Sequence, residues 1–539
     1  MSHKTGYEVA EGKVPFNFQT LDVLNSTQVA VRGNGAFGLM FYSLAKNIFC
    51  RKYLAFLFLS LCLTVLKAEN IKAETLDLRL EVAATNRLIV NGKFSAGQNP
   101  PKSLSSGWLF PDQYADAVNL SRRFSKPEFF DVSGAAVTYE TNASNEFVAA
   151  RPINAWRYEV NLEKPTDAMT AAHVSWLKES GGLLMPADLL PQLDDRETIS
   201  ARVKVVLPVG WKIATTENKI GENEFSVPDV EKAVFLVGKN FTERTGWIGK
   251  TEFRIAWSEG KWTFSSDEIV TMASRILEEH TRTFGETSVN RFQLILLPLP
   301  PEVNADRWRA ETRGASIVLL SGAIPFKSIA LNRLHEQLRH EIFHFWIPNG
   351  LNLSGSYDWF YEGFTLYQAL KTGVRLEYIR FEDFLDTLSR AVDAARRTQN
   401  GNQISLLDAS RERWRGGSAS LIYAKGLVVA FLCDAALLNQ TGGRQTLSDV
   451  FRELYRKHNL AAARVNGNAA ALAVLMKNPQ IAEIIEKYVE KAGAIEPQTL
   501  ENLSGLVNLS NSSFTKLAIK SSLDGRQKKV LEKLGYKRS

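Results

Sequence analysis

Apolar and polar residues alternate in short runs through the first part of the chain's body. Residues 76–82 and 202–206 show this alternation, and glycine, proline and asparagine separate such runs at short intervals. A period of two is typical of strands that bury one face. We therefore predict an antiparallel, sandwich-like β domain over residues 74–249, with a late strand at 234–241.

Near residue 250 the pattern changes, because apolar residues at helical spacing now appear between short apolar runs. The predicted elements are a strand at 252–257, a helix at 267–284, a strand at 292–297, a polar loop at 307–314, a second strand at 316–320 and helices at 447–457 and 481–491. The expected fold class is therefore α+β. A second domain covers residues 250–440, and a mostly helical region covers 441–539.

A further predicted helix, at 331–346, carries two histidines on one face. Its apolar residues run along one side of the helix: Leu334, Leu338, Ile342 and Phe345. His340 and His344 are four residues apart, so both imidazoles leave the same face and can bind one zinc ion. Glu341 follows the first histidine directly, which places its carboxylate beside the metal rather than on it. His335 lies about 140° around the helix from His340 and is expected at the surface or behind the ligands.

Seventeen residues separate His344 from Glu362, and Pro348 among them can end the helix. Glu362 can therefore return as a third ligand and leave one tetrahedral position open for water, as in catalytic zinc sites. We predict one zinc ion per chain, held by His340, His344 and Glu362, with Glu341 as general base for a metal-activated water. The alternative is a charged helix face that carries two histidines by chance.

Two blocks of sequence then carry a resemblance to a known family. The segment His-Glu-Ile-Phe-His-Phe-Trp at 340–346, followed by Trp-Phe-Tyr-Glu-Gly-Phe-Thr-Leu-Tyr at 359–367, resembles the gluzincin zinc metallopeptidases. It is most similar to the glycyl aminopeptidase family and more distantly to the alanyl and leukotriene-hydrolase-like aminopeptidases. Trp346, Gly363 and Tyr367 match, and the ordered motifs cover about residues 200–460. The resemblance implies that residues 250–440 form a thermolysin-like catalytic domain.

The resemblance also implies roles for residues outside the metal site. Tyr423-Ala424-Lys425-Gly426 is similar to a Tyr-x-Lys-Gly segment whose tyrosine hydroxyl supports the transition state, so Tyr423 is a candidate catalytic residue. The alternative for Tyr423 is an aromatic residue packed ahead of a core helix. Lys425 is expected near the site rather than in the chemistry.

Aminopeptidases of this class hold the substrate's free ammonium with an acidic residue just before the edge strand. The matching segment is residues 310–314, so the resemblance implies Glu311 as a substrate-binding residue, against the alternative of a plain loop carboxylate. The edge strand at 316–320 is expected to pair with the substrate backbone. The chain departs from the pattern at Ala369, where an acidic residue often stands, and its interval from His344 to Glu362 is one residue short.

The beginning of the chain reads as a targeting segment. Residues 53–66 are apolar or small and follow Arg51 and Lys52, which is typical of a secretory signal and short for a membrane span. We predict a leader over residues 1–73, with Met40 as an alternative start, and an exported protein that is periplasmic or secreted. The alternative is an uncleaved anchor.

The net charge of +7 lies at the two ends of the chain. Residues 1–68 carry a net charge of +4 and residues 513–539 a net charge of +6, so the body is slightly acidic and does not favour nucleic acid. The basic tail is expected to be a helix docked on the body, against the alternative of a helix on a membrane surface. No stable membrane insertion is expected after leader removal. Cys433, within an apolar run, is expected in the core.

These patterns together predict an exported zinc metallopeptidase that acts on peptides, with aminopeptidase activity favoured. One alternative is an endopeptidase on the same scaffold. Another is a non-catalytic, zinc-containing exported binding protein, although such a protein would need neither Glu341 nor Tyr423.

Overall fold

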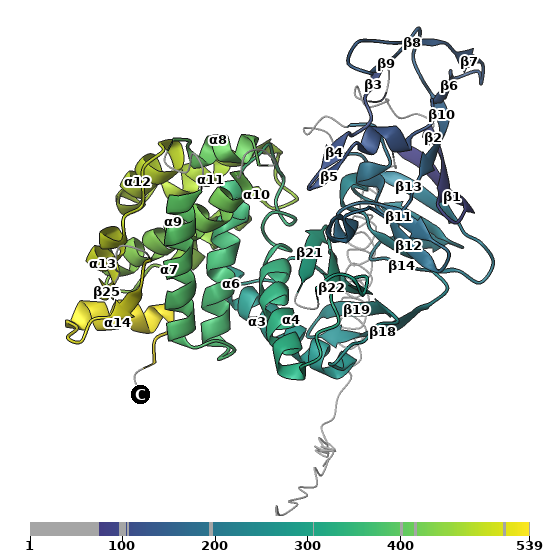
Figure 1. The fold of residues 1–539 in the computed structure, drawn as a ribbon. Helices are drawn as coiled ribbons and strands as arrows, with labels where there is room; N and C mark the ends of the chain where they lie inside the picture. The colour runs from purple at the N-terminus through teal and green to yellow at the C-terminus, as the bar shows by residue number, and fades with distance from the viewer. Residues whose placement is uncertain are drawn as a thin grey trace, which may run out of the picture. The chain divides into compact units, whose positions relative to one another are not determined.

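The structure is a computed structural model of the 539-residue chain. It describes residues 75–95, 104, 107–192, 198–304, 307–398, 403–413, 418–509 and 514–537 (Figure 1). These residues belong to one compact unit. The expected leader, the start at Met40 and the uncleaved anchor all concern residues outside the described part.

The N-terminal part is built on two main sheets. The larger runs in the order β15 (Asn218–Gly221), β16 (Glu224–Val227), β13 (Ala201–Val206), β1 (Leu76–Ala84), β2 (Arg87–Phe94), β10 (Ala155–Asn161), β6 (Glu128–Phe130) and β7 (Ala136–Val137). The smaller runs in the order β11 (Trp176–Lys178), β12 (Gly181–Leu184), β17 (Phe235–Gly238) and β14 (Lys212–Ala214). Leu78 and Val203 from the first sheet share one apolar core with Leu184 and Val237 from the second, which confirms the predicted sandwich-like packing.

Two details of this domain differ from the prediction. Strands β1 and β13 pair in parallel. The chain between them is more than a hundred residues long, and a long crossover permits parallel pairing that a hairpin forbids. The strand predicted at 234–241 is two strands, because β17 ends at Gly238 and the chain resumes as β18 (Phe241–Ile248) in another sheet. Gly238 has φ +151°, and a Cβ there would lie 2.5 Å from the carbonyl oxygen of Ser180.

Three small strand pairs and a short helix complete this part. Strand β9 (Phe147–Ala149) joins β3 (Gly107–Trp108) to β8 (Tyr139–Thr141), and β4 (Gln113–Tyr114) pairs with β5 (Ala117–Val118). The 3₁₀ helix η2 (Ala168–Ala172) lies against strand β21 (Trp308–Arg313) of the next sheet. The β4–β5 hairpin, the end of η2 and the 3₁₀ helix η4 (Val230–Lys232) supply the N-terminal residues that line the candidate site.

A mixed five-stranded sheet follows, in the order β18 (Phe241–Ile248), β19 (Thr251–Ser258), β20 (Arg291–Pro298), β22 (Ser316–Ser321) and β21 (Trp308–Arg313). Strand β21 is the edge strand next to β22 and runs antiparallel to it, and β18 forms the opposite edge. The prediction of a polar loop at 307–314 is therefore wrong. The strand predicted at 316–320 is confirmed as β22, but it lies inside the sheet rather than at its edge. The continuous apolar run of β22 is buried on both faces, as suits an interior strand, whereas the polar residues of β21 suit an edge beside a cavity.

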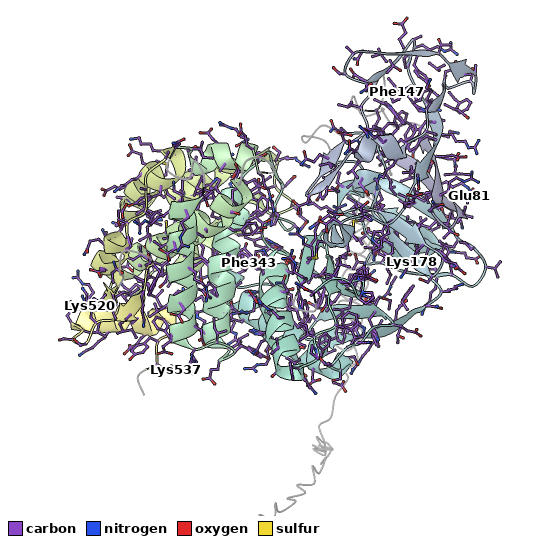
Figure 2. All side chains as sticks on the ribbon, viewed as in Figure 1. Glu81, Phe147, Lys178, Phe343, Lys520 and Lys537 are labelled. Atoms are coloured by element: carbon purple, nitrogen blue, oxygen red, sulfur yellow. The ribbon has the colours of Figure 1, made fainter. Side chains whose placement is uncertain are left out.

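Two helices accompany this sheet. Helix α3 (Ser266–Phe284) begins at a capping box in which Ser265 and Glu268 bond each other's backbone, and it ends at Gly285 in the left-handed conformation. Helix α4 (Lys327–Phe343) contacts α3 and buries the predicted apolar stripe of Leu334, Leu338 and Ile342. Figure 2 labels Phe343, the last residue of α4, in the interior of the described body.

The remaining chain is mainly helical, which confirms the α+β class. Its helices are α5 (Asp358–Tyr361), α6 (Gly363–Arg375), α7 (Phe381–Arg397), α8 (Leu406–Arg411), α9 (Ser418–Gln440), α10 (Leu447–His458), α11 (Gly467–Leu475), α12 (Pro479–Ile485), α13 (Pro497–Ser504) and α14 (Gly525–Leu534). The short pairs β23–β24 (Leu353–Ser354, Val465–Asn466) and β25–β26 (Leu506–Asn508, Leu517–Ile519) connect them.

Helix α9 is the centre of this helical part. It is long and apolar enough to cross a membrane, but 94% of its apolar window is buried inside the protein, so it is a core helix. It contacts α6, α7, α8 and α12, and Figure 1 shows α6, α7 and α9 side by side. Cys433 in α9 is fully buried, as predicted, and burial raises the pKa of its thiol.

The basic tail is docked on the body. Helix α14 buries Val530, Leu531 and Leu534 and contacts α9, which confirms the predicted docked helix for residues 525–534. The domain boundaries stay predictions of the sequence. The one at residue 249 falls in the turn of the β18–β19 hairpin, and the one at 440 coincides with the end of α9.

Candidate metal centre

The two histidines of the predicted motif lie at the end of α4. The helix ends at Phe343, but His344 keeps helical angles, with φ −64° and ψ −13°. The imidazoles of His340 and His344 therefore still leave the same face, and their Nε2 atoms lie 3.0 Å apart. The Nδ1 atom of His344 lies 2.8 Å from the carbonyl oxygen of Ile347. When Nδ1 donates this bond, the lone pair of Nε2 is free for a metal.

Glu362 completes the predicted set of ligands. It occupies the junction of α5 and α6, and its Oε2 lies 3.2 Å from Nε2 of His340 and 3.6 Å from Nε2 of His344. Donor atoms around a tetrahedral zinc ion, with bonds of about 2.1 Å, lie roughly 3.4 Å apart. Within the described residues these three side chains form a group that could hold a metal ion, and they fit zinc.

The second oxygen of Glu362 is bound by Arg413. Nη2 of Arg413 donates to Oε1 of Glu362 over 2.8 Å. Burial alone would raise the pKa of Glu362, but the guanidinium and the two histidine nitrogens hold it well below its usual range. The carboxylate is therefore ionised and ready to bind a cation.

Glu341 lies beside the three ligand residues and lines the same cavity. Its side chain is almost fully buried. The hydroxyl Oγ1 of Thr312, on β21, lies 2.7 Å from Oε2 of Glu341 and 2.9 Å from its carbonyl oxygen. Because this bond holds one carboxylate oxygen, the other is left for the cavity.

Tyr423 reaches the site from the first turns of α9. Its hydroxyl accepts a hydrogen bond from Nη2 of Arg413 at 3.1 Å, and its ring centre lies 6.4 Å from that of His340. Burial and the charge of Glu362 raise the pKa of Tyr423 well above its ordinary value, although Arg413 opposes them. The phenol therefore keeps its proton and can donate it in a hydrogen bond.

Two glycines let α9 come this close to Glu362. A Cβ on Gly363 would lie 2.5 Å from the Cα of Gly426, and a Cβ on Gly426 would lie 2.9 Å from the Cα of Gly363. Only glycine at both positions permits this approach. The Glu-Gly and Lys-Gly pairs of the two sequence blocks thus meet, three residues from Tyr423 and one from Glu362.

Glu311 lies in β21 and lines the same cavity, which has a volume of about 370 Å³. Its Oε1 accepts from the Tyr114 hydroxyl at 2.9 Å and from Nη2 of Arg313 at 2.9 Å, and its Oε2 contacts Nδ1 of His173. Burial alone would raise the pKa of Glu311, but Arg313 and His173 lower it to about 2. The protein's own donors therefore bind both oxygens of the proposed amine anchor.

Other residues that match the family motifs have structural contacts. The Tyr367 hydroxyl and Nζ of Lys371 donate to Oδ2 of Asp434 at 2.6 and 2.5 Å, and this buried group ties α6 to α9. Nε1 of Trp346 donates to the carbonyl oxygen of Glu286. Lys425 is buried and is not one of the described residues that line the cavity.

His335 is buried rather than exposed. Its ring lies against that of Tyr378, with centres 3.4 Å apart, and it lines a different cavity from the metal group. Burial and the nearby cations Arg339 and Arg275 lower the pKa of His335 to about 2, so it stays neutral.

Several residues of the site could not be found from the sequence. Arg413 belongs to no motif and follows Glu362 by 51 residues. Thr312, His173 and Tyr114 come to the site only through the folding of β21 against the N-terminal domain. The sequence offered one clue to this group, because Tyr361 directly precedes the ligand Glu362. Its hydroxyl accepts a hydrogen bond from Arg413.

No protein-family model matches the sequence, and no curated relative does. Solved structures do match. An aminopeptidase N family protein from Idiomarina loihiensis gives a TM-score of 0.64 at 16% identity, over 80% of this chain and 79% of that chain. An M1 zinc metallopeptidase from Deinococcus radiodurans gives 0.53 at 16% identity, over 79% of this chain and 95% of that chain. A variant of such an enzyme from the same organism, bound to a Tyr-Ser-Ala substrate, gives 0.53 at 15% identity, over 79% and 94%. The chain therefore has the M1 aminopeptidase fold.

Proposed function

We propose that this chain is a zinc-dependent peptide hydrolase and that it acts as an aminopeptidase. The observation that carries the proposal is the arrangement of His340, His344 and Glu362 at the spacing of tetrahedral zinc ligands, in one cavity with Glu341 and Tyr423. A purely structural zinc site would need neither of the last two residues.

Zinc bound by these three side chains would lower the pKa of a water at its open position and polarise a substrate carbonyl. Glu341 would take a proton from the attacking water and pass it to the departing amine. Thr312 would hold one oxygen of Glu341 in place during both transfers. The Tyr423 hydroxyl would donate a hydrogen bond to the substrate oxygen as its negative charge develops.

Two observations favour an aminopeptidase over an endopeptidase. Glu311 is an ionised carboxylate in the same cavity, and an ammonium could compete with its present donors. One of the structural neighbours is an aminopeptidase N family protein. Strand β21, rather than β22, would pair with the substrate backbone, because it is the edge strand. Hydrolysis rates of free-amine peptides and their N-acetylated forms distinguish an aminopeptidase from an endopeptidase, since only an aminopeptidase requires the free amine.

The central test is Glu341→Gln, which keeps the size of the side chain and removes the base. We expect the purified variant to hold about one zinc per chain, as the wild type does, while kcat on aminoacyl substrates falls at least about 100-fold. Full turnover by a zinc-loaded Glu341→Gln protein would refute the proposal. If the wild type binds zinc and hydrolyses no peptide, the non-catalytic alternative is correct.

A further inference from the structure

Arg413 occupies the centre of a polar group that joins three elements of the site. Its side chain is 15% exposed and follows the end of α8. Nη1 donates to Oδ1 of Asp358 at 2.6 Å and to the Tyr361 hydroxyl at 2.9 Å. Nη2 donates to Oε1 of Glu362 at 2.8 Å and to the Tyr423 hydroxyl at 3.1 Å. Both arms of the guanidinium are therefore used, in the fixed fork geometry of arginine.

The first consequence concerns which oxygen of Glu362 faces the metal position. Oε2 lies toward the two histidine nitrogens, while Oε1 is held by Arg413. A carboxylate whose outer oxygen makes a charge-assisted hydrogen bond cannot rotate freely and presents one oxygen only. Outer partners of this kind orient metal ligands, and their loss commonly weakens metal affinity by 10–100-fold.

The second consequence concerns the proton of Tyr423. Arginine has donors and no acceptor, so the Tyr423 oxygen must accept in its bond with Nη2. The single hydrogen of the phenol is then directed away from Arg413. The Glu362 carboxylate is one acceptor for it, and a substrate oxygen in the cavity would compete for the same hydrogen. Without Arg413 the hydroxyl would lose this constraint.

A single nitrogen of Arg413 makes the contacts with both Glu362 and Tyr423. Nη2 of Arg413 bonds both Glu362 and Tyr423, so a shift of the guanidinium moves both partners together. Asp358 fixes the other arm, and it is buried and itself bonded by the Tyr361 hydroxyl at 2.6 Å. The guanidinium is thus anchored through Nη1 to the Asp358 carboxylate.

We propose that Arg413 is a positioning residue that selects the metal-facing oxygen of Glu362 and directs the proton of Tyr423 into the cavity. The role in turnover rests on the proposed function, whereas the role in metal binding does not. A merely structural role, as one half of a buried ion pair with Asp358, would change the stability of the protein and leave metal affinity and the coupling to Tyr423 unchanged.

The metal role is tested by competition titration of zinc against a chromogenic chelator. The variants are Arg413→Gln and Arg413→Lys, and the control is Arg411→Gln, because Arg411 is exposed and, among the described residues, pairs with Asp408. We expect the zinc dissociation constant to rise about 10–100-fold in Arg413→Gln, less in Arg413→Lys, and to stay unchanged in the control. A constant for Arg413→Gln within threefold of the wild type would overturn this half of the proposal.

The role through Tyr423 is tested by a double-mutant cycle at saturating zinc. We expect Arg413→Gln and Tyr423→Phe each to lower kcat by about 10–100-fold, with KM changed less than threefold. The double variant should then have a kcat within about threefold of Tyr423→Phe, because Arg413 acts through the hydroxyl that is already absent. Losses that multiply in the double variant would overturn this half.

The experiments distinguish an error in the roles assigned to Arg413 from an error in the proposed function. If the wild type shows no peptidase activity, the proposed function and the role through Tyr423 are both wrong, while the zinc titration still decides the role toward Glu362. If the wild type is active and both Arg413 readouts are unchanged, only the assignment of Arg413 is wrong.

Discussion

Thr312 on the edge strand and Glu341 on the metal-binding helix are joined by a hydrogen bond of 2.7 Å from Oγ1 to Oε2. The same hydroxyl lies 2.9 Å from the carbonyl oxygen of Glu341, so it touches the residue at two points. Strand β21, which would pair with the substrate, is thereby coupled to the base that would activate water. The position of the base depends on a side chain from a different layer of the fold.

Replacing Thr312 by valine keeps the shape of the side chain and removes its donor. Hydrogen bonds to charged groups contribute about 1.5–3 kcal/mol, so we expect kcat to fall roughly 10–100-fold at saturating zinc while KM changes little. Steady-state kinetics on an aminoacyl substrate measures this effect. Thr312→Ser is the matched control, because it keeps the hydroxyl and should retain most of the activity. Equal kcat values for the valine variant and the wild type would show that the bond does not position Glu341.

The close approach of Gly363 and Gly426 leads to a second prediction. A Cβ on Gly426 would lie 2.9 Å both from the Cα of Gly363 and from the carbonyl oxygen of Trp359. Gly426→Ala must therefore push α9 away from α6, at an overpacking cost of about 1–3 kcal/mol. Because Tyr423 lies one turn earlier on α9, the same shift should move its hydroxyl and lower kcat.

Urea unfolding and kinetics of Gly426→Ala, both at saturating zinc, measure these two effects. Gly525→Ala serves as the control, because a Cβ at Gly525, at the start of α14, meets no atom within 4 Å. We expect the control to keep the stability and the kcat of the wild type. A stable and fully active Gly426→Ala protein would mean that the two helices need not touch.

How much the sequence could predict follows from the kind of signal each residue carries. His340, His344 and Glu362 have their meaning in local spacing on helices, and the structure brings all three together. The polar residues of β21 led to the wrong prediction of a loop, because a strand at the edge of a cavity carries polar side chains and has the composition of a loop. The edge position expected for its neighbour β22 came from the resemblance to a thermolysin-like catalytic domain.

Arg413 marks the limit of sequence reasoning. Its partners are Glu362 and Tyr423, which come from separate helices, and no periodicity relates the three residues. His173 and Tyr114 are similar, since they reach Glu311 from another domain. The export of the chain, its periplasmic or secreted location and its peptide partner stay predictions, because they depend on residues 53–66 and on the proposed chemistry.

The buried group around Glu311 gives the chain a specific response to acid. Arg313 and His173 lower the pKa of Glu311 to about 2, against 4.5 for an unperturbed glutamate. A folded-state pKa below the unfolded one means that the ionised carboxylate stabilises the fold above about pH 4.5. That contribution, about 3 kcal/mol at most, is lost progressively as the pH falls from 4.5 toward 2, because protonation first becomes favourable in the unfolded chain.

Glu311→Gln removes the titrating group and should flatten this part of the stability profile. We expect the difference in free energy of unfolding between wild type and variant to be constant from pH 5 to 7 and to narrow below about pH 4.5. Urea unfolding of both proteins, with a chelator present to exclude metal binding, measures the difference. Glu179→Gln is the control, because its side chain is 88% exposed and should leave the wild-type profile unchanged. Parallel profiles for wild type and Glu311→Gln down to pH 2.5 would contradict the lowered pKa.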